Sequence, residues 1–183
     1  MIQDRVQKGL RNLAKRIAKR VERNNLFEQP GERSSQEPIF EVPTDQMIQL
    51  MKSEEVEECL LGARVVNHWA TWCEPCVDEL DILSSIQSHI GADKMLGINW
   101  DLFQGGPFDE ACVEITNQTE RVGLEYRHCV VSDEPEVFFA HFGLEEQLVP
   151  QTIVYSPTFE VLFHRVGVLT EEDIAKVVQF VKQ

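Results

Sequence analysis

Apolar residues in the first 24 positions recur at steps of three and four, and most of the positions between them are basic. This spacing predicts a basic amphipathic helix over 1–24. Its apolar positions are Ile2, Val6, Leu10, Leu13, Ile17 and Val21. Two interpretations of this helix stay open: it lies on an anionic membrane surface through residues 2–23, or it docks on its own acidic domain or on a partner. The stretch 25–38 is rich in Asn, Gln, Glu, Pro, Gly and Ser, and is predicted to be a flexible linker because it cannot bury enough apolar surface to stay ordered.

From residue 39 onward, β-rich runs alternate with helical patterns. Strands are predicted over 63–69, 94–100, 126–131, 152–155 and 160–164. Helices are predicted over 76–90, 107–122 and 134–142, from a capping box at Thr170 and Asp173 to the C-terminus, and over a short apolar face that starts near Pro43 and includes Met51. The alternation predicts one α/β domain over 39–183.

The charge is divided unevenly between these parts. Residues 1–25 hold eight basic and two acidic side chains, whereas the remaining 158 residues hold nine basic and 29 acidic ones, for a formal net charge of −14 in the whole chain. Such a division predicts a basic arm on an acidic domain. An acidic domain would be repelled by phosphates, so nucleic acid is not an expected partner.

Two absences lead to an expectation about localisation. The sequence contains no run of 18 apolar residues, so a transmembrane helix is not expected. In the first 40 residues, charged or amide side chains interrupt the apolar stretch that a signal peptide would need. The five cysteines are an odd number and do not resemble a disulfide scaffold. The sequence therefore predicts a cytoplasmic monomer, peripheral at the membrane surface if the basic helix binds lipid.

A C-x-x-C motif, Cys73-Glu74-Pro75-Cys76, stands where a predicted strand passes into a predicted helix. Two cysteines at this spacing in the first turn of a helix can meet at bonding distance. The free N–H groups and the dipole at the helix start stabilise a thiolate, so Cys73 is the expected nucleophile and Cys76 the resolving thiol. Pro75 is tolerated in the first turn, where its missing N–H costs little. Glu74 is unusual, because a neighbouring carboxylate opposes thiolate formation at Cys73 and would favour a more reducing couple.

The segment from Val65 to Leu80, VVNHWATWCEPCVDEL, resembles the active site of thioredoxin-fold proteins, specifically the TlpA/ResA-like thiol-disulfide oxidoreductases. The family motif W-C-x-P-C is matched from Trp72 to Cys76, and Leu148-Val149-Pro150-Gln151-Thr152 matches the family's cis-proline segment. The resemblance implies a central mixed sheet flanked by helices, with an inserted helix–strand unit over 107–131. It further implies that Pro150 is cis and that the Val149 backbone and Trp72 contact an extended substrate.

This resemblance implies a thiol-disulfide oxidoreductase that reduces disulfides in protein substrates and is itself reduced by an upstream electron donor. It needs no cofactor beyond the redox-active Cys73–Cys76 disulfide and no metal. Asn67 stands where thioredoxin has a buried acid, as is common in TlpA-like proteins, so general-base help is expected from Glu74 or water. His68 replaces an aromatic or aliphatic residue and is interpreted as a satisfied core or edge histidine.

Alternative functions rest on the same cysteines. A zinc site would need two more ligands at a characteristic spacing, and the sequence has no second C-x-x-C. A non-catalytic carrier of a soft metal such as Cu(I), using Cys73, Cys76 and His68, stays open as the second hypothesis. A peroxidase is disfavoured because Thr71 stands two positions before Cys73 instead of three.

The remaining candidate residues are interpreted structurally. Cys59, Cys112 and Cys129 fall in apolar patterns and are expected to be small buried hydrophobes. The aromatic run at 137–142 is expected to be helical core, as is Trp69. The acidic run from Glu54 to Glu58 is expected to be a solvated face.

Overall fold

A computed structural model of the protein describes residues 15–16, 19, 47–142 and 149–183. The helices and strands in these ranges are β1 (Ile48–Met51), α2 (Ser53–Cys59), β2 (Val65–Trp69), α3 (Glu74–Ile90), β3 (Met95–Asn99), α4 (Phe108–Val122), β4 (Arg127–Val131), α5 (Pro135–Phe142), β5 (Gln151–Tyr155), β6 (Val161–Val166) and α6 (Glu171–Val181). Two short 3-10 helices, η1 (Ala92–Lys94) and η2 (Asp101–Gln104), flank β3. The predicted linker over 25–38, and most of the helix predicted over 1–24, lie outside the described residues.

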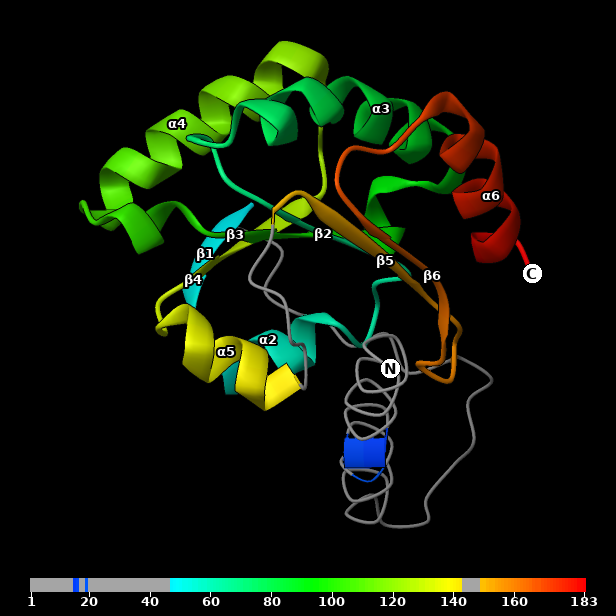
Figure 1. The fold of residues 1–183 in the computed structure, drawn as a ribbon, viewed down its shortest axis with the longest axis horizontal. Helices are drawn as coiled ribbons and strands as arrows, with labels where there is room; N and C mark the ends of the chain where they lie inside the picture. The colour runs from blue at the N-terminus through cyan, green and yellow to red at the C-terminus, as the bar shows by residue number, and fades with distance from the viewer. Residues whose placement is uncertain (1–14, 17–18, 20–46, 143–148) are drawn as a thin grey trace, which may run out of the picture.

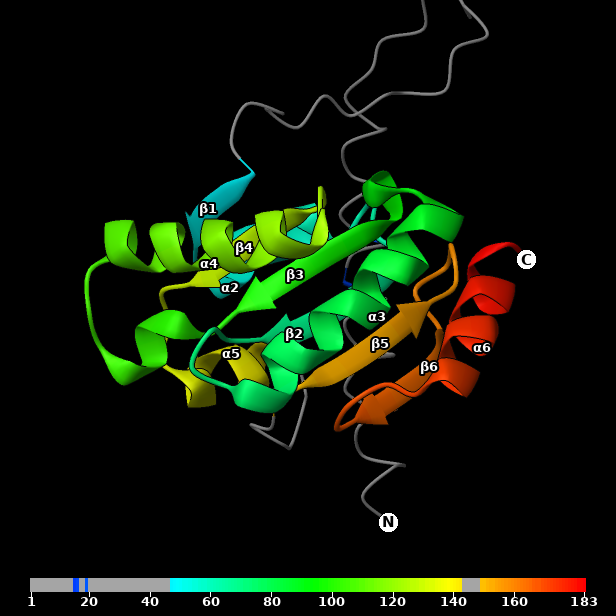
Figure 2. The same ribbon diagram turned by 90° about the horizontal axis from the view of Figure 1, so that it is seen from above.

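The six strands form one mixed sheet in the order β1-β4-β3-β2-β5-β6. The first four of these are parallel, whereas β5 is antiparallel to both β2 and β6. Helices α3, α4 and α6 cover one face of the sheet, and α2 and α5 cover the other (Figures 1 and 2). The predicted α/β class with a mixed central sheet is confirmed, and α4 with β4 forms the helix–strand unit predicted over 107–131.

The core lies on both faces of the central strands. Every residue of β2, β3 and β5 is buried, because helices cover the sheet from both sides. On α3, the apolar face packed against the sheet includes Leu80, Leu83 and Ile86, all of them inaccessible to solvent. At the start of α6, the predicted capping box is present, and the Thr170 N–H donates to Asp173 Oδ2 over 2.9 Å.

The helix predicted to run from Pro43 to Met51 is wrong in the part that the structure describes. Residues Ile48–Met51 form the edge strand β1, which pairs in parallel with β4 from His128 to Val131. The sequence alone could not reveal this because four apolar-rich residues fit a helix face and a strand equally well. The sheet decides between them, since only an extended segment can pair with the exposed edge of β4.

The acidic run lies on helix α2, where Glu54, Glu55 and Glu58 are exposed as expected of a solvated face, whereas the carboxylate of Glu57 is buried. Glu57 is 8% exposed, and its Oε1 lies 2.9 Å from His141 Nε2 and 3.3 Å from the Arg16 guanidinium. Arg16, which is helical, also donates to the His141 carbonyl oxygen. These contacts join Arg16 to α2 and α5, while the two interpretations of the basic segment as a whole both stay predictions.

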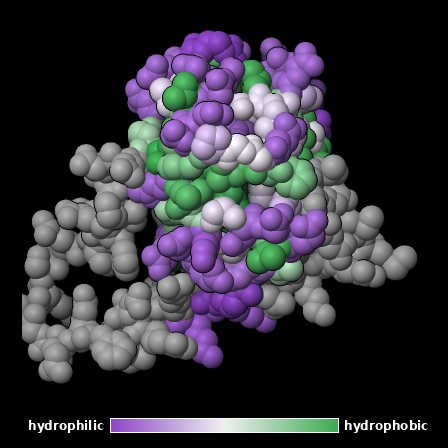
Figure 3. Space-filling model, turned by 90° about the vertical axis from the view of Figure 1, so that its left-hand side faces the viewer, coloured by the Kyte–Doolittle hydropathy of each residue, from purple (hydrophilic) through white to green (hydrophobic). Residues whose placement is uncertain are grey.

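The aromatic core of α5 is mostly as expected. Phe138, Phe139 and Phe142 are buried, but Val137 points outward and is 56% exposed, so its predicted place in the core is wrong. Figure 3 faces the side on which β1 lies in Figure 1 and shows a band of apolar side chains between the polar surfaces of the helices.

The three cysteines outside the motif differ in burial. Cys59 and Cys129 are buried as expected, and the Cys59 thiol lies 3.5 Å from Met51 Sδ. Cys112, on α4, is only half-buried, so its predicted burial is wrong.

Candidate functional site

The C-x-x-C motif lies at the N-terminus of α3, directly after the loop that follows β2. Cys73 is the N-cap residue of α3 and Pro75 falls in its first turn. Cys73 and Cys76 are joined by a disulfide, and their Cα atoms are 5.2 Å apart. The Cys73 carbonyl oxygen accepts the N–H groups of Cys76 and Val77 at 2.9 and 3.1 Å, which begins the helix. Cys73 is 7% exposed and Cys76 1%, an order that suits attack by Cys73 and resolution by Cys76.

The loop before Cys73 is anchored by an aspartate that the sequence reasoning missed. Asp101 Oδ1 accepts the Thr71 N–H at 2.7 Å, and Oδ2 accepts the Thr71 hydroxyl at 3.0 Å. Burial raises the pKa of Asp101, and these hydrogen bonds oppose the rise. The available signal was its position, because an acid directly after a buried strand stands at the edge where the active-site loop begins.

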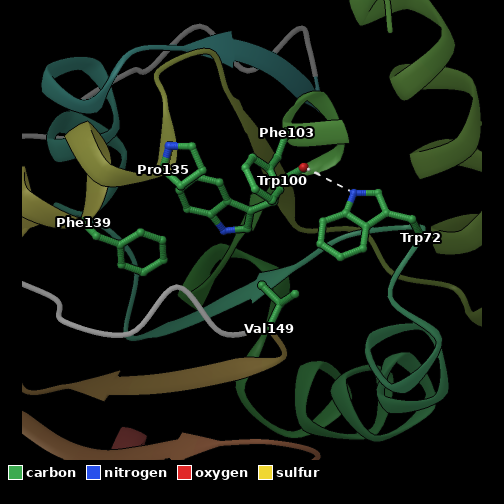
Figure 4. A pocket seen from close by; sticks show the side chains of 6 residues that line it. All are labelled: Trp72, Trp100, Phe103, Pro135, Phe139 and Val149. Carbon is green, nitrogen blue, oxygen red and sulfur yellow. Dashed lines mark hydrogen bonds between the residues drawn. The ribbon is translucent and has the colours of Figure 1, made fainter. Parts of the chain in front are cut away.

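The cis-proline that the resemblance implied is present at Val149-Pro150. Gln151, the next residue, pairs with His68 near the end of β2, so the proline segment lies beside the start of the active-site loop. Trp72 and Val149 line one pocket together with Trp100, Phe103, Pro135 and Phe139 (Figure 4). The structure thus brings together Trp72 and Val149, the two predicted substrate contacts that flank Cys73 and Pro150.

Glu74 and Glu79 occupy opposite environments on α3. Glu74, which was expected to supply general-base help, is exposed in the first turn. Glu79 is inaccessible to solvent and lies three residues after Cys76 on the buried face of the helix. Burial raises the pKa of Glu79 to about 7, and hydrogen bonds from Leu169, Thr152 and Asn67 hold the rise in check.

Glu79 is the second residue that the sequence reasoning missed, and a signal for it was available. Glu79 falls on the same face of α3 as Cys76, Leu80 and Leu83, so it is an acid on a helix face that otherwise packs into the core. A buried carboxylic acid with a pKa near neutrality is suited to proton transfer, and such perturbed groups gather at functional sites.

Asn67 and His68 point to opposite faces of the sheet, as successive strand residues must. Asn67 Nδ2 donates to Glu79 Oε1 and to Thr152 Oγ1, both at 3.1 Å. The His68 ring packs among Trp100, Phe138 and Phe139 on the α5 side. Burial lowers the pKa of His68 to about 3, so the ring is neutral.

The interpretation of His68 as a satisfied histidine is wrong in one respect. Among the described residues, its buried Nδ1 has no hydrogen-bond partner, and the ring is packed between aromatic side chains. Of the two predicted places, core or edge, it occupies the core, since β2 lies inside the sheet. Within the described ranges, no three His, Cys, Asp or Glu side chains are grouped as metal ligands would be.

Comparison with solved structures identifies proteins that share this fold. A DsbF homologue from Corynebacterium diphtheriae is 25% identical, with a TM-score of 0.51 over 63% of this chain and 69% of its own. A secreted thiol-disulfide isomerase from Corynebacterium glutamicum is 26% identical, with a TM-score of 0.52 over 65% of this chain and 70% of its own. A thioredoxin-family thiol:disulfide interchange protein from Chlorobium tepidum has a TM-score of 0.52 at 21% identity, over 69% of this chain and 83% of its own.

The chain has the thioredoxin-like fold of thiol-disulfide oxidoreductases. These neighbours fit the resemblance to the TlpA/ResA-like family that the motif carried. Together with the disulfide between Cys73 and Cys76, these neighbours support the prediction of a thiol-disulfide oxidoreductase. No protein-family model and no curated protein matches the sequence.

The predicted cytoplasmic localisation is wrong. The neighbour from Corynebacterium glutamicum is a secreted protein, which points away from a cytoplasmic location. The prediction rested on the lack of a transmembrane or signal-peptide pattern and on an odd number of cysteines. None of these features determines where a redox-active dithiol works. None of the helices in the described ranges is both long and apolar enough to cross a bilayer.

Proposed function

We propose that this protein reduces disulfides in protein substrates through the Cys73–Cys76 dithiol. The observation that carries the proposal is the placement of this disulfide at the start of α3, with the more exposed Cys73 in the N-cap position and the Val149-Pro150 segment beside the active-site loop. Free N–H groups at a helix start stabilise a thiolate, so the reduced Cys73 is the nucleophile.

The first step forms a mixed disulfide. The Cys73 thiolate attacks one sulfur of the substrate disulfide, the substrate S–S bond breaks, and the other substrate sulfur leaves as a thiolate that takes up a proton. The substrate segment lies along the Val149 backbone next to Pro150, with Trp72 against its side chains. Pro75 shapes the first turn of α3 that holds both sulfurs.

The second step releases the reduced substrate. Cys76 gives up its proton, attacks the Cys73 sulfur and closes the Cys73–Cys76 disulfide, while the second substrate sulfur leaves as a thiolate. Glu79 accepts the proton of Cys76, because it lies one turn away on the same buried face and its pKa of about 7 lets it hold or release a proton near neutrality. The substrate gains two electrons and two protons, and an upstream dithiol donor restores the reduced protein.

The proposal is tested by the reduction potential of the Cys73–Cys76 pair. The purified protein is equilibrated in graded dithiol/disulfide buffers and its thiols are counted by alkylation and mass spectrometry, with Cys112→Ser as a matched control outside the motif. A two-electron couple near the thioredoxin value of about −270 mV supports a reductase. A potential near that of the oxidant DsbA, about −120 mV, would reverse the proposed direction. Failure of the two cysteines to form a disulfide at any poise would overturn the proposal.

A further inference from the structure

We infer that the pocket beside Trp72 and Val149 binds one large apolar side chain, aromatic or leucine-like, that neighbours the target cysteine of a polypeptide substrate. The inference rests on the proposed function and adds the substrate class. It assigns selection of that side chain to Trp100, Phe103 and Phe139, which lie outside the C-x-x-C and cis-proline segments.

Four parts of the fold meet at this pocket (Figure 4). Trp72 comes from the active-site loop and Val149 from the cis-proline segment. Trp100 directly precedes η2 and Phe103 lies within it, and Pro135 and Phe139 come from α5. The pocket is therefore continuous with the redox site, because two of its lining residues directly precede Cys73 and Pro150. A side chain held here belongs to a residue close to the reacting substrate sulfur.

The far wall of the pocket is held in place before any substrate arrives. The rings of Trp100 and Phe139 are stacked, with centroids 5.1 Å apart and planes 14° apart. The Trp72 Nε1–H donates to the Trp100 carbonyl oxygen over 3.4 Å, which joins the active-site loop to η2. A preformed wall of this kind lowers the ordering cost of binding.

The mouth of the pocket exposes aromatic surface that a substrate would cover. Trp72 is 38% exposed and Phe103 57%, and their ring centroids are 6.5 Å apart. Covering such surface is favourable by about 25 cal/mol for each Å² removed from water. Two exposed aromatic rings beside a reactive disulfide are typical of a recognition surface rather than of scattered surface apolar residues.

The lining also decides what the pocket rejects. The six described residues that line it are all apolar or aromatic, so a charged side chain would lose its hydration without gaining a partner among them. Phe, Leu and similar residues are therefore favoured over Ala, and Ala over Asp.

The test measures how fast Cys73 forms a mixed disulfide with peptides that differ at one position. The full chain carrying Cys76→Ser is reduced and mixed with peptides whose single cysteine is linked to 2-mercaptoethanol. One series varies the residue before the cysteine and a second series varies the residue after it, each through Phe, Leu, Ala and Asp. Intact-mass spectrometry follows the step in which the Cys73 thiolate displaces 2-mercaptoethanol as its thiolate. Bis(2-hydroxyethyl) disulfide measures the reactivity of Cys73 without a peptide.

In at least one series, we expect Phe and Leu peptides to react about tenfold faster than the Ala peptide, with Asp slowest. Phe103→Ala should reduce this preference to less than about threefold, since it removes one wall of the mouth. Val137→Ala is the matched control, because Val137 is an equally exposed apolar residue on α5 that does not line the pocket, and the preference should persist.

Equal rates for all peptides, with normal reactivity toward bis(2-hydroxyethyl) disulfide, would overturn the inference and leave the proposed function standing. A preference that survives Phe103→Ala, or that Val137→Ala also removes, would overturn the assignment to this pocket. Absence of any reaction with bis(2-hydroxyethyl) disulfide would overturn both the inference and the proposed function.

Discussion

Asn67 Nδ2 donates a hydrogen bond to Glu79 Oε1 over 3.1 Å, across the interface between the central strand β2 and helix α3. Thr152 Oγ1 donates to the same oxygen at 3.3 Å, and the Leu169 N–H donates to Oε2 at 2.9 Å. These three donors stabilise the ionised carboxylate, yet burial outweighs them and leaves the pKa of Glu79 near 7. The group is therefore poised to change charge in the core, beside the resolving cysteine.

Glu79→Gln should make the stability of the protein less sensitive to pH. The pKa of Glu79 is raised from an ordinary 4.5 to about 7, so the folded state binds the proton more tightly than the unfolded state does. Stability attributable to this group is therefore greatest below about pH 4.5 and is lost as the pH rises to about 7, by about 3 kcal/mol in all. Urea unfolding at pH 5 and pH 8 should show a larger decline for the wild type than for Glu79→Gln.

Glutamine is a conservative replacement at this position. Asn67 Oδ1 is buried and has no hydrogen-bond partner among the described residues, so it is free to accept a hydrogen bond from the new amide once the Asn67 amide rotates. Glu74→Gln serves as the matched control because Glu74 lies exposed on the same helix. An identical pH dependence in the wild type and Glu79→Gln would show that Glu79 is not the titrating group.

The contrast between Glu74 and Glu79 explains what the sequence could predict at this site. The C-x-x-C spacing and the proline were visible because they depend on local geometry at a helix start and on a motif. Glu79 was missed because its environment comes from Thr152 and Leu169, which lie more than 70 positions away in the chain. Long-range contacts of this kind set burial, and burial sets the pKa.

The same distinction separates the correct and incorrect predictions of secondary structure. Helices α3 and α4 carry 17 and 15 residues with clear apolar periodicity and end before glycines, so their bounds were nearly right. Strand β1 has only four residues, and the neighbouring edge of β4 determines its conformation. A short apolar run contains too little periodicity to reveal a partner 80 positions away.

Gly97→Ala should destabilise the protein strongly, because a Cβ at position 97 would lie 2.2 Å from Nδ1 of the buried His128. His128 cannot move away freely, since the Trp69 Nε1–H donates to the same Nδ1 over 3.2 Å. We expect a loss of at least about 2 kcal/mol in the free energy of unfolding, measured by urea denaturation. Gly62→Ala is the control, because no heavy atom of the described part of the chain lies within 4 Å of its Cβ position. Similar losses in both variants would contradict the packing argument.

Asp101→Ala should loosen the loop that carries Trp72. The substitution removes the acceptor of the Thr71 N–H and of its hydroxyl, which are part-buried. Leaving such donors unpaired costs about 1–3 kcal/mol. The free energy of unfolding reports the cost of the unpaired donors. The rate of acrylamide quenching of tryptophan fluorescence reports the loosening of the loop. Asp81→Ala, an exposed acid on α3, should leave both unchanged, and equal behaviour of the two variants would argue against an anchoring role for Asp101.

Glu74→Gln should lower the pKa of the Cys73 thiol in the reduced protein. Glu74 directly follows Cys73 in the first turn of α3, so its carboxylate opposes the thiolate that the helix start stabilises. Removing that charge favours the thiolate, which stabilises the reduced form and makes the couple more oxidising. The pKa is measured from the pH dependence of Cys73 alkylation in the Cys76→Ser background, and the potential in the unmodified dithiol. Asp81→Asn, two turns along the same helix, controls for a change in net charge. An identical pKa of Cys73 in the wild type and in Glu74→Gln would show that the Glu74 carboxylate does not set the redox properties of the dithiol. Those properties would then come from the helix start and from the buried surroundings of Cys76.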